Sequence, residues 1–150
     1  MAQTTPLADI GWKAADFRLL GVDGKYHTLD ELRGPRGTLV MFICNHCPYV
    51  QAVLDRIIRD AIELVPYGVN TIAINSNDPE TYPEDSYEAM VEVARHHQFP
   101  FHYLFDETQD VAREYDAVCT PDFFGFNATL GLQYRGRLDA SRKDPAPPDA

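Results

Sequence analysis

Apolar residues recur along the chain with two different periods, and the changes of period mark the predicted elements. Residues 38–43 form an apolar run of strand length, typical of a central strand covered on both faces. From 49 to 65 apolar residues recur at helical spacing and predict an amphipathic helix, and residues 69–75 read as a second buried strand. The apolar face of the helix is expected to comprise Val50, Val53, Leu54, Ile57, Ile58, Ala61, Ile62 and Val65.

This order of strand, helix and strand predicts a βαβ unit whose two strands are parallel neighbours, because such crossovers are right-handed. Residues 44–48 follow the first strand directly. They are therefore expected at the C-terminal edge of a parallel sheet, which is where open α/β sheets place their chemistry.

The N-terminal part predicts a hairpin that extends this sheet. Residues 15–20 alternate as a half-buried strand, an Asp-Gly turn follows at 23–24, and 26–28 return before a short helical turn at 29–32. One side of the core is expected to be capped by Phe17, Leu20, Leu29 and Leu32.

The second half of the chain predicts further strands and helices in alternation. The loop 77–85 precedes a helix that ends near Arg95, His96 and His97; a strand at 99–105, a helix at 108–117, a strand at 119–127 and a return strand at 132–138 follow. Adjacent histidines face different directions on a helix, so His96 and His97 are expected to be solvated. The same is expected of the acidic residues Asp78, Glu80, Glu84, Asp85 and Glu88.

Length and composition predict one domain at 1–138 and an irregular, proline-rich tail at 139–150. The net charge of −10 and the lack of a basic cluster disfavour nucleic acid as a partner. No window is apolar enough for a membrane span, and the N-terminus has no signal-peptide pattern. We therefore expect a cytoplasmic protein.

The candidate chemistry lies in Cys44-Asn45-His46-Cys47-Pro48, between the first buried strand and the long helix. The positive end of the helix macrodipole favours a thiolate at Cys44, which makes Cys44 the candidate nucleophile. Cys47, one helical turn later, is the candidate resolving thiol. His46 between them is a candidate for tuning the thiolate, or else points into solvent.

The same two cysteines also have a spacing that zinc and copper use. Structural zinc needs four ligands, and the sequence offers only Cys119 and scattered histidines beside the pair. We therefore expect no resident metal or other cofactor, with copper or zinc delivery as the weaker alternative.

These residues resemble the thioredoxin superfamily, specifically its redoxin branch, which includes proteins described as AhpC/TSA-like. The matching pieces are Ala15-Asp16-Phe17, the Asp23-Gly24-Lys25 turn, the strand into the C-x-x-C motif, and Thr120-Pro121-Asp122-Phe123-Phe124. The resemblance implies an α/β thioredoxin-like fold: a central mixed sheet flanked by helices, with the N-terminal hairpin as an extension.

The resemblance also implies roles for Thr120 and Pro121. The family's proline at this place is cis and lies against the dithiol, and the backbone before it docks the substrate. Cys119, two residues earlier, is either a third redox cysteine or a buried packing residue. The family usually closes with a C-terminal helix, so either the sequence stops before that helix or the helix is absent. An uncovered sheet face would favour a homodimer.

We therefore expect a thiol:disulfide oxidoreductase, with Cys44 and Cys47 cycling between dithiol and disulfide. Its partners would be protein disulfides or dithiols, with a reductase or glutathione to complete the cycle. The alternatives are a thiol peroxidase with an antioxidant role and the metal-delivery protein. A peroxiredoxin would carry a Pro and a Thr before its cysteine, whereas Met41-Phe42-Ile43 stands here.

Overall fold

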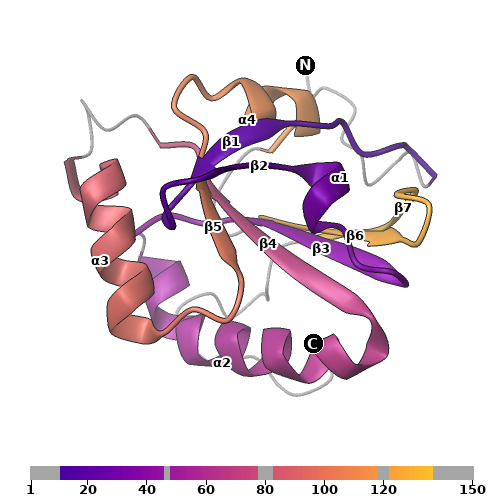
Figure 1. Ribbon diagram of the computed structural model, residues 1–150, viewed down its shortest axis with the longest axis horizontal. Coiled ribbons are helices and arrows are strands. Elements are labelled where there is room, and N and C mark those ends of the chain that lie inside the picture. The colour runs from indigo at the N-terminus through magenta and orange to yellow at the C-terminus, as the bar shows by residue number, and fades with distance from the viewer. Residues whose placement is uncertain (1–10, 46–47, 78–82, 118–121, 137–150) are drawn as a thin grey trace.

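The computed structural model describes residues 11–45, 48–77, 83–117 and 122–136 (Figure 1). Within these ranges, strands and helices alternate around one sheet. In chain order they are β1 (Arg18–Gly21), β2 (Tyr26–Thr28), α1 (Leu29–Leu32), β3 (Gly37–Phe42), α2 (Pro48–Leu64), the 3-10 turn η2 (Val65–Tyr67), β4 (Val69–Asn75), the 3-10 turn η3 (Pro83–Asp85), α3 (Tyr87–His97), β5 (His102–Phe105), α4 (Asp110–Tyr115), β6 (Asp122–Asn127) and β7 (Leu132–Gly136).

The described strands form one mixed sheet in the order β2-β1-β5-β4-β3-β6-β7. Strand β3 pairs in parallel with β4, and β4 pairs in parallel with β5; the pairs toward both edges are antiparallel. This confirms the predicted βαβ unit and the two hairpins. The N-terminal hairpin joins the sheet through β1 and β5, so it extends the sheet as expected.

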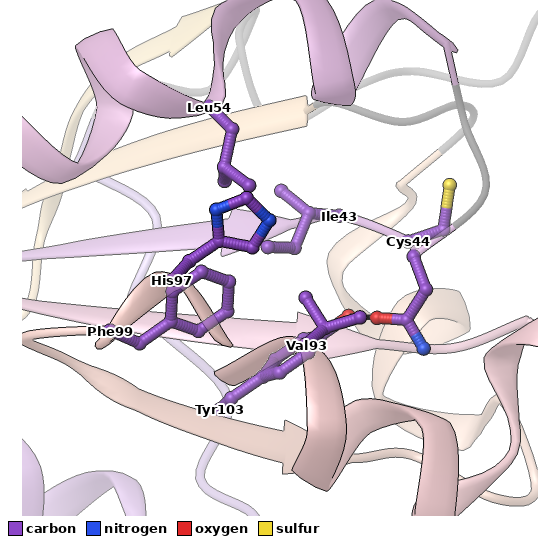
Figure 2. Close-up of a pocket in the computed structure, with 8 residues that line it drawn as sticks. Ile43, Cys44, Leu54, Val93, His97, Phe99 and Tyr103 are labelled. Atoms are coloured by element: carbon purple, nitrogen blue, oxygen red, sulfur yellow. Dashed lines mark hydrogen bonds between the residues drawn. The ribbon is translucent and has the colours of Figure 1, made fainter. Parts of the chain in front are cut away.

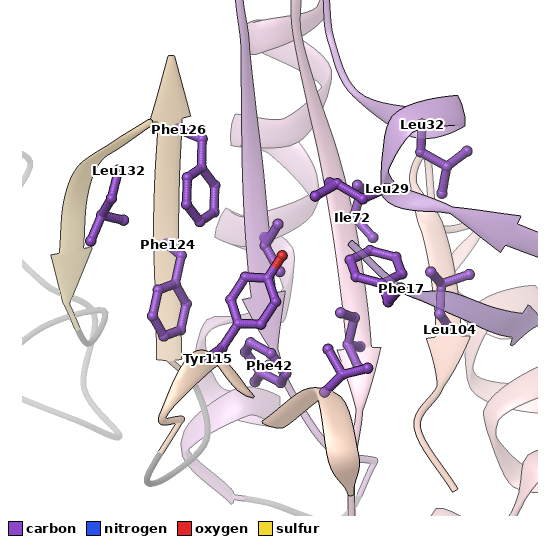
Figure 3. Close-up of a cluster of buried hydrophobic side chains, with 13 residues drawn as sticks. Phe17, Leu29, Leu32, Phe42, Ile72, Leu104, Tyr115, Phe124, Phe126 and Leu132 are labelled. Atoms are coloured by element: carbon purple, nitrogen blue, oxygen red, sulfur yellow. The ribbon is translucent and has the colours of Figure 1, made fainter. Parts of the chain in front are cut away.

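Helices cover both faces of the sheet, with α2 and α3 on one face and α1 and α4 on the other (Figure 1). The core on the α1 and α4 face is rich in aromatic residues (Figure 3). Phe17, Leu29 and Leu32 are buried there as predicted, whereas Leu20 is only half-buried. The second cluster, on the α2 and α3 face, includes Cys44 together with Met41, Ile43, Leu54, Ile57, Ala61, Ala73, Met90, Phe101, Tyr103 and Phe123.

The apolar face of α2 is narrower than the sequence pattern predicts. Leu54, Ile57 and Ala61 face the sheet and are buried, but Ile62 and Val65 are 53% and 56% exposed. Among the described side chains of α2, these three buried positions, spaced by three and four residues, contact the sheet together with the half-buried Ile58. The predictions for Val50 and Val53 concern side chains outside those described. No helix in the described ranges is both long enough and apolar enough to cross a membrane.

Strand β5 begins three residues later than predicted. The residues just before it cap the C-terminal end of α3 with backbone hydrogen bonds. Gln98 adopts a left-handed conformation with φ of 53°, and its amide donates to carbonyls of the last helical turn. The amide of Phe99 then donates to the carbonyl of Ala94 at 3.0 Å. These hydrogen bonds satisfy helix carbonyls and cap the helix, so Phe99 does not join the sheet.

The N-terminal hairpin is closed by His27. Its Nε2 lies 2.8 Å from Asp23 Oδ2 and its Nδ1 lies 3.1 Å from Glu31 Oε2. Burial alone would lower the pKa of His27, but the hydrogen bonds and negative charges of the two acids raise it above its ordinary value. The imidazole therefore connects the turn after β1 to the first turn of α1.

A buried ion pair joins β6 to β7. The guanidinium of Arg135 donates from Nη2 to Asp122 Oδ2 at 2.7 Å and from Nε to Asp122 Oδ1 at 3.2 Å. It also donates to the carbonyl of Asp116 at 2.9 Å. The two side chains are 5% and 2% exposed. Removing one charge would leave the other without its main partner in the interior, which is strongly unfavourable.

We therefore expect Arg135→Met to lower the free energy of unfolding by about 3–5 kcal/mol, measured by urea denaturation. The matched control is Arg95→Met, because Arg95 forms an exposed pair with Glu92 and should change stability little. A loss for Arg135→Met no larger than for the control would show that the buried pair does not stabilise the fold. The double variant Asp122→Leu/Arg135→Met should recover part of the loss, since neither charge of this pair is then left buried without the other.

Candidate functional site

Cys44 lies at the C-terminal end of β3, in the gap between that strand and the start of α2 at Pro48. The pairing of β3 with β4 continues one residue beyond the strand, because Ile43 N–H donates to the Ile74 carbonyl at 2.9 Å. Cys44 itself is 3% exposed. The sheet therefore holds the backbone of the first cysteine up to the point where the chain turns into the helix, as the sequence predicted.

The other predicted site residues, His46, Cys47, Cys119, Thr120 and Pro121, lie outside the described residues. Their roles stay predictions.

The residue that follows Pro121 in the sequence shows which strand this segment leads into. Asp122, which begins β6, pairs with Phe42 at the end of β3. The segment that follows Pro121 thus enters the sheet beside the strand that leads to Cys44.

Beneath Cys44 lies a buried polar network built around the carboxylate of Asp85. Asp85 is 0% exposed, which corrects its prediction as a solvated loop residue. Its Oδ1 accepts from Asn45 N–H at 2.6 Å and from Asn75 Nδ2 at 3.0 Å, and its Oδ2 accepts from Asn77 Nδ2 at 3.0 Å. These donors come from the residues after β3, from the end of β4 and from the residues after β4. A buried carboxylate with such donors avoids the cost of an unpaired charge.

Tyr103 on β5 extends the network to a third strand. Its hydroxyl donates to Asn45 Oδ1 at 2.8 Å and accepts from Asn75 Nδ2 at 3.1 Å. Burial is the largest influence on the pKa of Tyr103 and raises it well above its ordinary value. The hydrogen bond from Asn75 lowers this pKa, and the negative charge of Asp85 raises it by a smaller amount. The phenol is therefore protonated at neutral pH and serves as a fixed donor to the residue after Cys44.

A cavity of about 260 Å³ adjoins this network. Its walls are mainly apolar, and His97 from the last turn of α3 contributes to them (Figure 2). His97 is half-buried, so only its neighbour His96 is exposed in the way predicted for both. In Figure 2 the sulfur of Cys44 points away from the His97 ring. The cavity is lined by Ile43, Cys44, Asn45, Leu54, Val93, His97, Phe99 and Tyr103.

The sequence did contain a signal for Asn75, Asn77 and Asp85. All three follow or end the apolar strand β4, at the sheet edge where the dithiol was expected. Polar residues at that edge are candidates for a site in any parallel sheet. Asp85 was missed because it stands among other acids in a loop, and composition alone favours solvation there.

The order of the strands, the helices on both faces and a cysteine at the end of β3 define a thioredoxin-like protein. Solved structures of other proteins share this fold, and two of them serve as examples. A putative thiol:disulfide interchange protein DsbE from Chlorobium tepidum matches with a TM-score of 0.71 at 21% identity, over 90% of this chain and 90% of its own. Peroxidoxin BcpB from Mycobacterium tuberculosis matches with a TM-score of 0.70 at 15% identity, over 85% and 84%. At these identities the likeness shows the fold alone.

The chain belongs to the AhpC/TSA family, which it matches over residues 10–140. An uncharacterized conserved protein from Geobacillus kaustophilus is 48% identical and has a TM-score of 0.88, over 93% of this chain and 74% of its own. No curated protein matches the sequence. The family and the fold together identify a redoxin of the thioredoxin-like class.

The hydroxyl of Tyr103 provides a test of the network. We expect Tyr103→Phe to lower the free energy of unfolding by about 1–3 kcal/mol, because Asn45 and Asn75 each lose a buried hydrogen-bond partner. Tyr67→Phe is the matched control, since Tyr67 is 68% exposed. Denaturant unfolding of both variants makes the comparison, and equal stability of the two would contradict a structural role for the buried hydroxyl.

Proposed function

We propose that the protein is a thiol:disulfide oxidoreductase in which Cys44 is the nucleophile and Cys47 the resolving thiol. The observation that carries the proposal is the place of Cys44: buried just after the C-terminal end of the central strand β3, in the short connection that leads to α2. The macrodipole of this 17-residue helix favours negative charge near its N-terminus. The thiolate is the form that attacks a disulfide.

The reaction proceeds in two exchanges. The Cys44 thiolate attacks one sulfur of the partner disulfide, forms a mixed disulfide and releases the other partner sulfur as a thiolate. The Cys47 thiolate then attacks the Cys44 sulfur, which releases the second partner thiolate and leaves a Cys44–Cys47 disulfide. Two electrons pass from the protein to the partner. A cytoplasmic thiol such as glutathione, or a dedicated reductase, would restore the dithiol.

The spacing of the cysteines favours this reaction over the two alternatives. A resolving thiol three residues after the nucleophile suits an intramolecular second step, in which the partner leaves as a dithiol. Peroxide reduction would use the same nucleophile, but Met41-Phe42-Ile43 lacks the Pro and Thr that the peroxiredoxin resemblance requires. Structural zinc would need four ligands, and the sequence offers only Cys119 and scattered histidines beside the pair.

The function is tested with Cys44→Ser. We expect this variant to lose insulin-disulfide reduction down to the uncatalysed rate, because serine cannot form the mixed disulfide. Cys119→Ser is the matched control, and it should retain most of the activity if Cys119 packs rather than reacts. Full activity of Cys44→Ser would exclude the proposal. Peroxide consumption by the wild-type protein, much faster than by free cysteine, would favour the peroxidase instead.

The network below Cys44 makes a second prediction. Asp85 places a negative charge one backbone unit from Cys44, which disfavours the thiolate and hence the reduced state. We expect Asp85→Asn to shift the exchange equilibrium with glutathione by roughly ten- to a hundredfold toward the dithiol, because one charge a few ångströms away is worth about 1–3 kcal/mol at an effective dielectric constant near 20.

The matched control for this change is Asp106→Asn. Asp106 is also buried, but its carboxylate accepts from the amides of Val111 and Ala112 in α4 and from the hydroxyl of Ser76. The variant Asp106→Asn should lower the free energy of unfolding without shifting the exchange equilibrium with glutathione. If both variants move the equilibrium equally, or neither does, the charge of Asp85 does not set the potential.

A further inference from the structure

We propose that Asp23, His27 and His102 bind a divalent transition-metal ion of the zinc class at the outer part of the sheet. One ligand atom from each of these residues lies within 4.8 Å of the other two. They come from the turn after β1, from β2 and from the start of β5, and His102 is 75 positions from His27 in the sequence. The pairing of β1 with both β2 and β5 brings them together.

The donor set fits zinc in type and in distance. Two imidazoles and one carboxylate are ligands that zinc accepts, whereas calcium and magnesium prefer oxygen alone. Ligand atoms on a tetrahedral zinc lie about 3.4 Å apart, given bonds of about 2.0–2.1 Å. The most distant pair would have to approach by at most about 1.4 Å. Because the His102 side chain is exposed, a rotation about its own bonds can supply this movement.

Both rings already lie close together. The ring centroids of His27 and His102 are 4.5 Å apart with an interplanar angle of 53°. A cavity of about 360 Å³, lined in part by Glu31 and His102, adjoins the cluster. Of the three proposed ligands only His102 lines this cavity, so its ring has open space on that side.

The groups behind the ligands are arranged as metal sites require. Glu31 Oε2 lies 3.1 Å from Nδ1 of His27, while Glu31 itself forms the capping box of α1 with Thr28. This carboxylate accepts a hydrogen bond from Nδ1 of His27 and leaves Nε2 facing Asp23, so Nε2 is the nitrogen that can exchange its proton for a metal ion. A carboxylate bonded to the far nitrogen of a ligating histidine is the usual outer partner in zinc sites.

Asp23 is held in the same way. Its Oδ1 accepts from the amide of Lys25 at 3.1 Å, which leaves Oδ2 directed at His27 Nε2 at 2.8 Å. The close approach depends on Gly21, because a Cβ there would lie 2.7 Å from Asp23 Oδ1 and 3.1 Å from the His27 ring. The backbone therefore orients both the carboxylate and the imidazole.

Binding exchanges a proton for the metal ion. Without metal, the 2.8 Å contact between Nε2 and Oδ2 holds a proton. Zinc takes the place of that proton, which passes to solvent, and no electron is transferred. The site does not depend on the proposed exchange reaction, since β4 and β5 separate the Cys44 strand from the hairpin by about 14 Å, three strand spacings.

The test is a titration of the full, untagged, reduced chain with zinc chloride against a chromophoric chelator. We expect His102→Ala to bind one equivalent fewer than the wild-type protein, or to bind that equivalent at least tenfold more weakly. His96→Ala, which removes another exposed histidine, should match the wild type. Both variants keep all the cysteines, so any zinc on thiolates is common to them and cancels in the comparison.

Two further measurements keep the outcome decisive. Glu31→Gln should weaken the same equivalent by about tenfold, the usual effect of an outer partner. The imidazole C–H signals of His27 and His102 should shift on addition of zinc, while those of His96 should not. Equal zinc binding by His102→Ala and His96→Ala, or no shift at His27 and His102, would overturn the proposal. Neither result bears on insulin reduction by Cys44, so the two proposals fail separately.

Discussion

The carboxylate of Asp85 ties together the ends of three strands, and the shape of the candidate site depends on it. Its partners are the backbone of Asn45 after β3 and the side chain of Asn75 at the end of β4, and through Asn75 and Asn45 it reaches Tyr103 on β5. A buried carboxylate costs several kcal/mol unless its partners are in place. The parallel pairing of β3 with β4 and of β4 with β5 must therefore place the partners of Asp85 side by side at the ends of these strands. A slip of one residue in β4 would turn Asn75 to the opposite face and break the network.

Most of the fold could be predicted because local patterns carried it. The apolar run 38–43 predicted β3, the helical period after it predicted α2, and the run 69–75 predicted β4. The crossover rule then predicted the parallel pairing of β3 with β4. The Asp-Gly turn likewise fixed the first hairpin, where Gly24 has φ of 82°. The limits of β5 and the inner face of α2 were less accurate, because contacts distant in the sequence decide them. The end of α3 uses Phe99, and the contact with the sheet buries fewer positions of α2 than its pattern offers.

The candidate site was predictable only in part, for the same reason. The C-x-x-C spacing and the strand before it indicated Cys44, and these are local features. Asp85 was assigned to solvent, because its burial is set by Asn45 and Asn75, 40 and 10 positions away. His27 and His102 were likewise described as scattered, although the β1 pairings place their rings 4.5 Å apart. Contacts between segments distant in the sequence decide which acidic and histidine side chains become buried. A short sequence pattern does not contain this information.

Two opposing electrostatic influences meet at Cys44. The N-terminus of α2 favours a thiolate by about 0.3–1 kcal/mol, or up to about 2 kcal/mol in a partly buried setting. Asp85 opposes it: its Oδ1 contacts Asn45 N, the atom bonded to the carbonyl carbon of Cys44. Charges about 6 Å apart interact by about 3 kcal/mol at an effective dielectric constant near 20. The amide donors around Asp85 disperse part of that charge, so the two influences are of similar size. In the proposed reaction the Cys44–Cys47 disulfide is then a weaker oxidant than the helix alone would make it, because the thiolate stabilises the reduced state only to the extent that Asp85 allows.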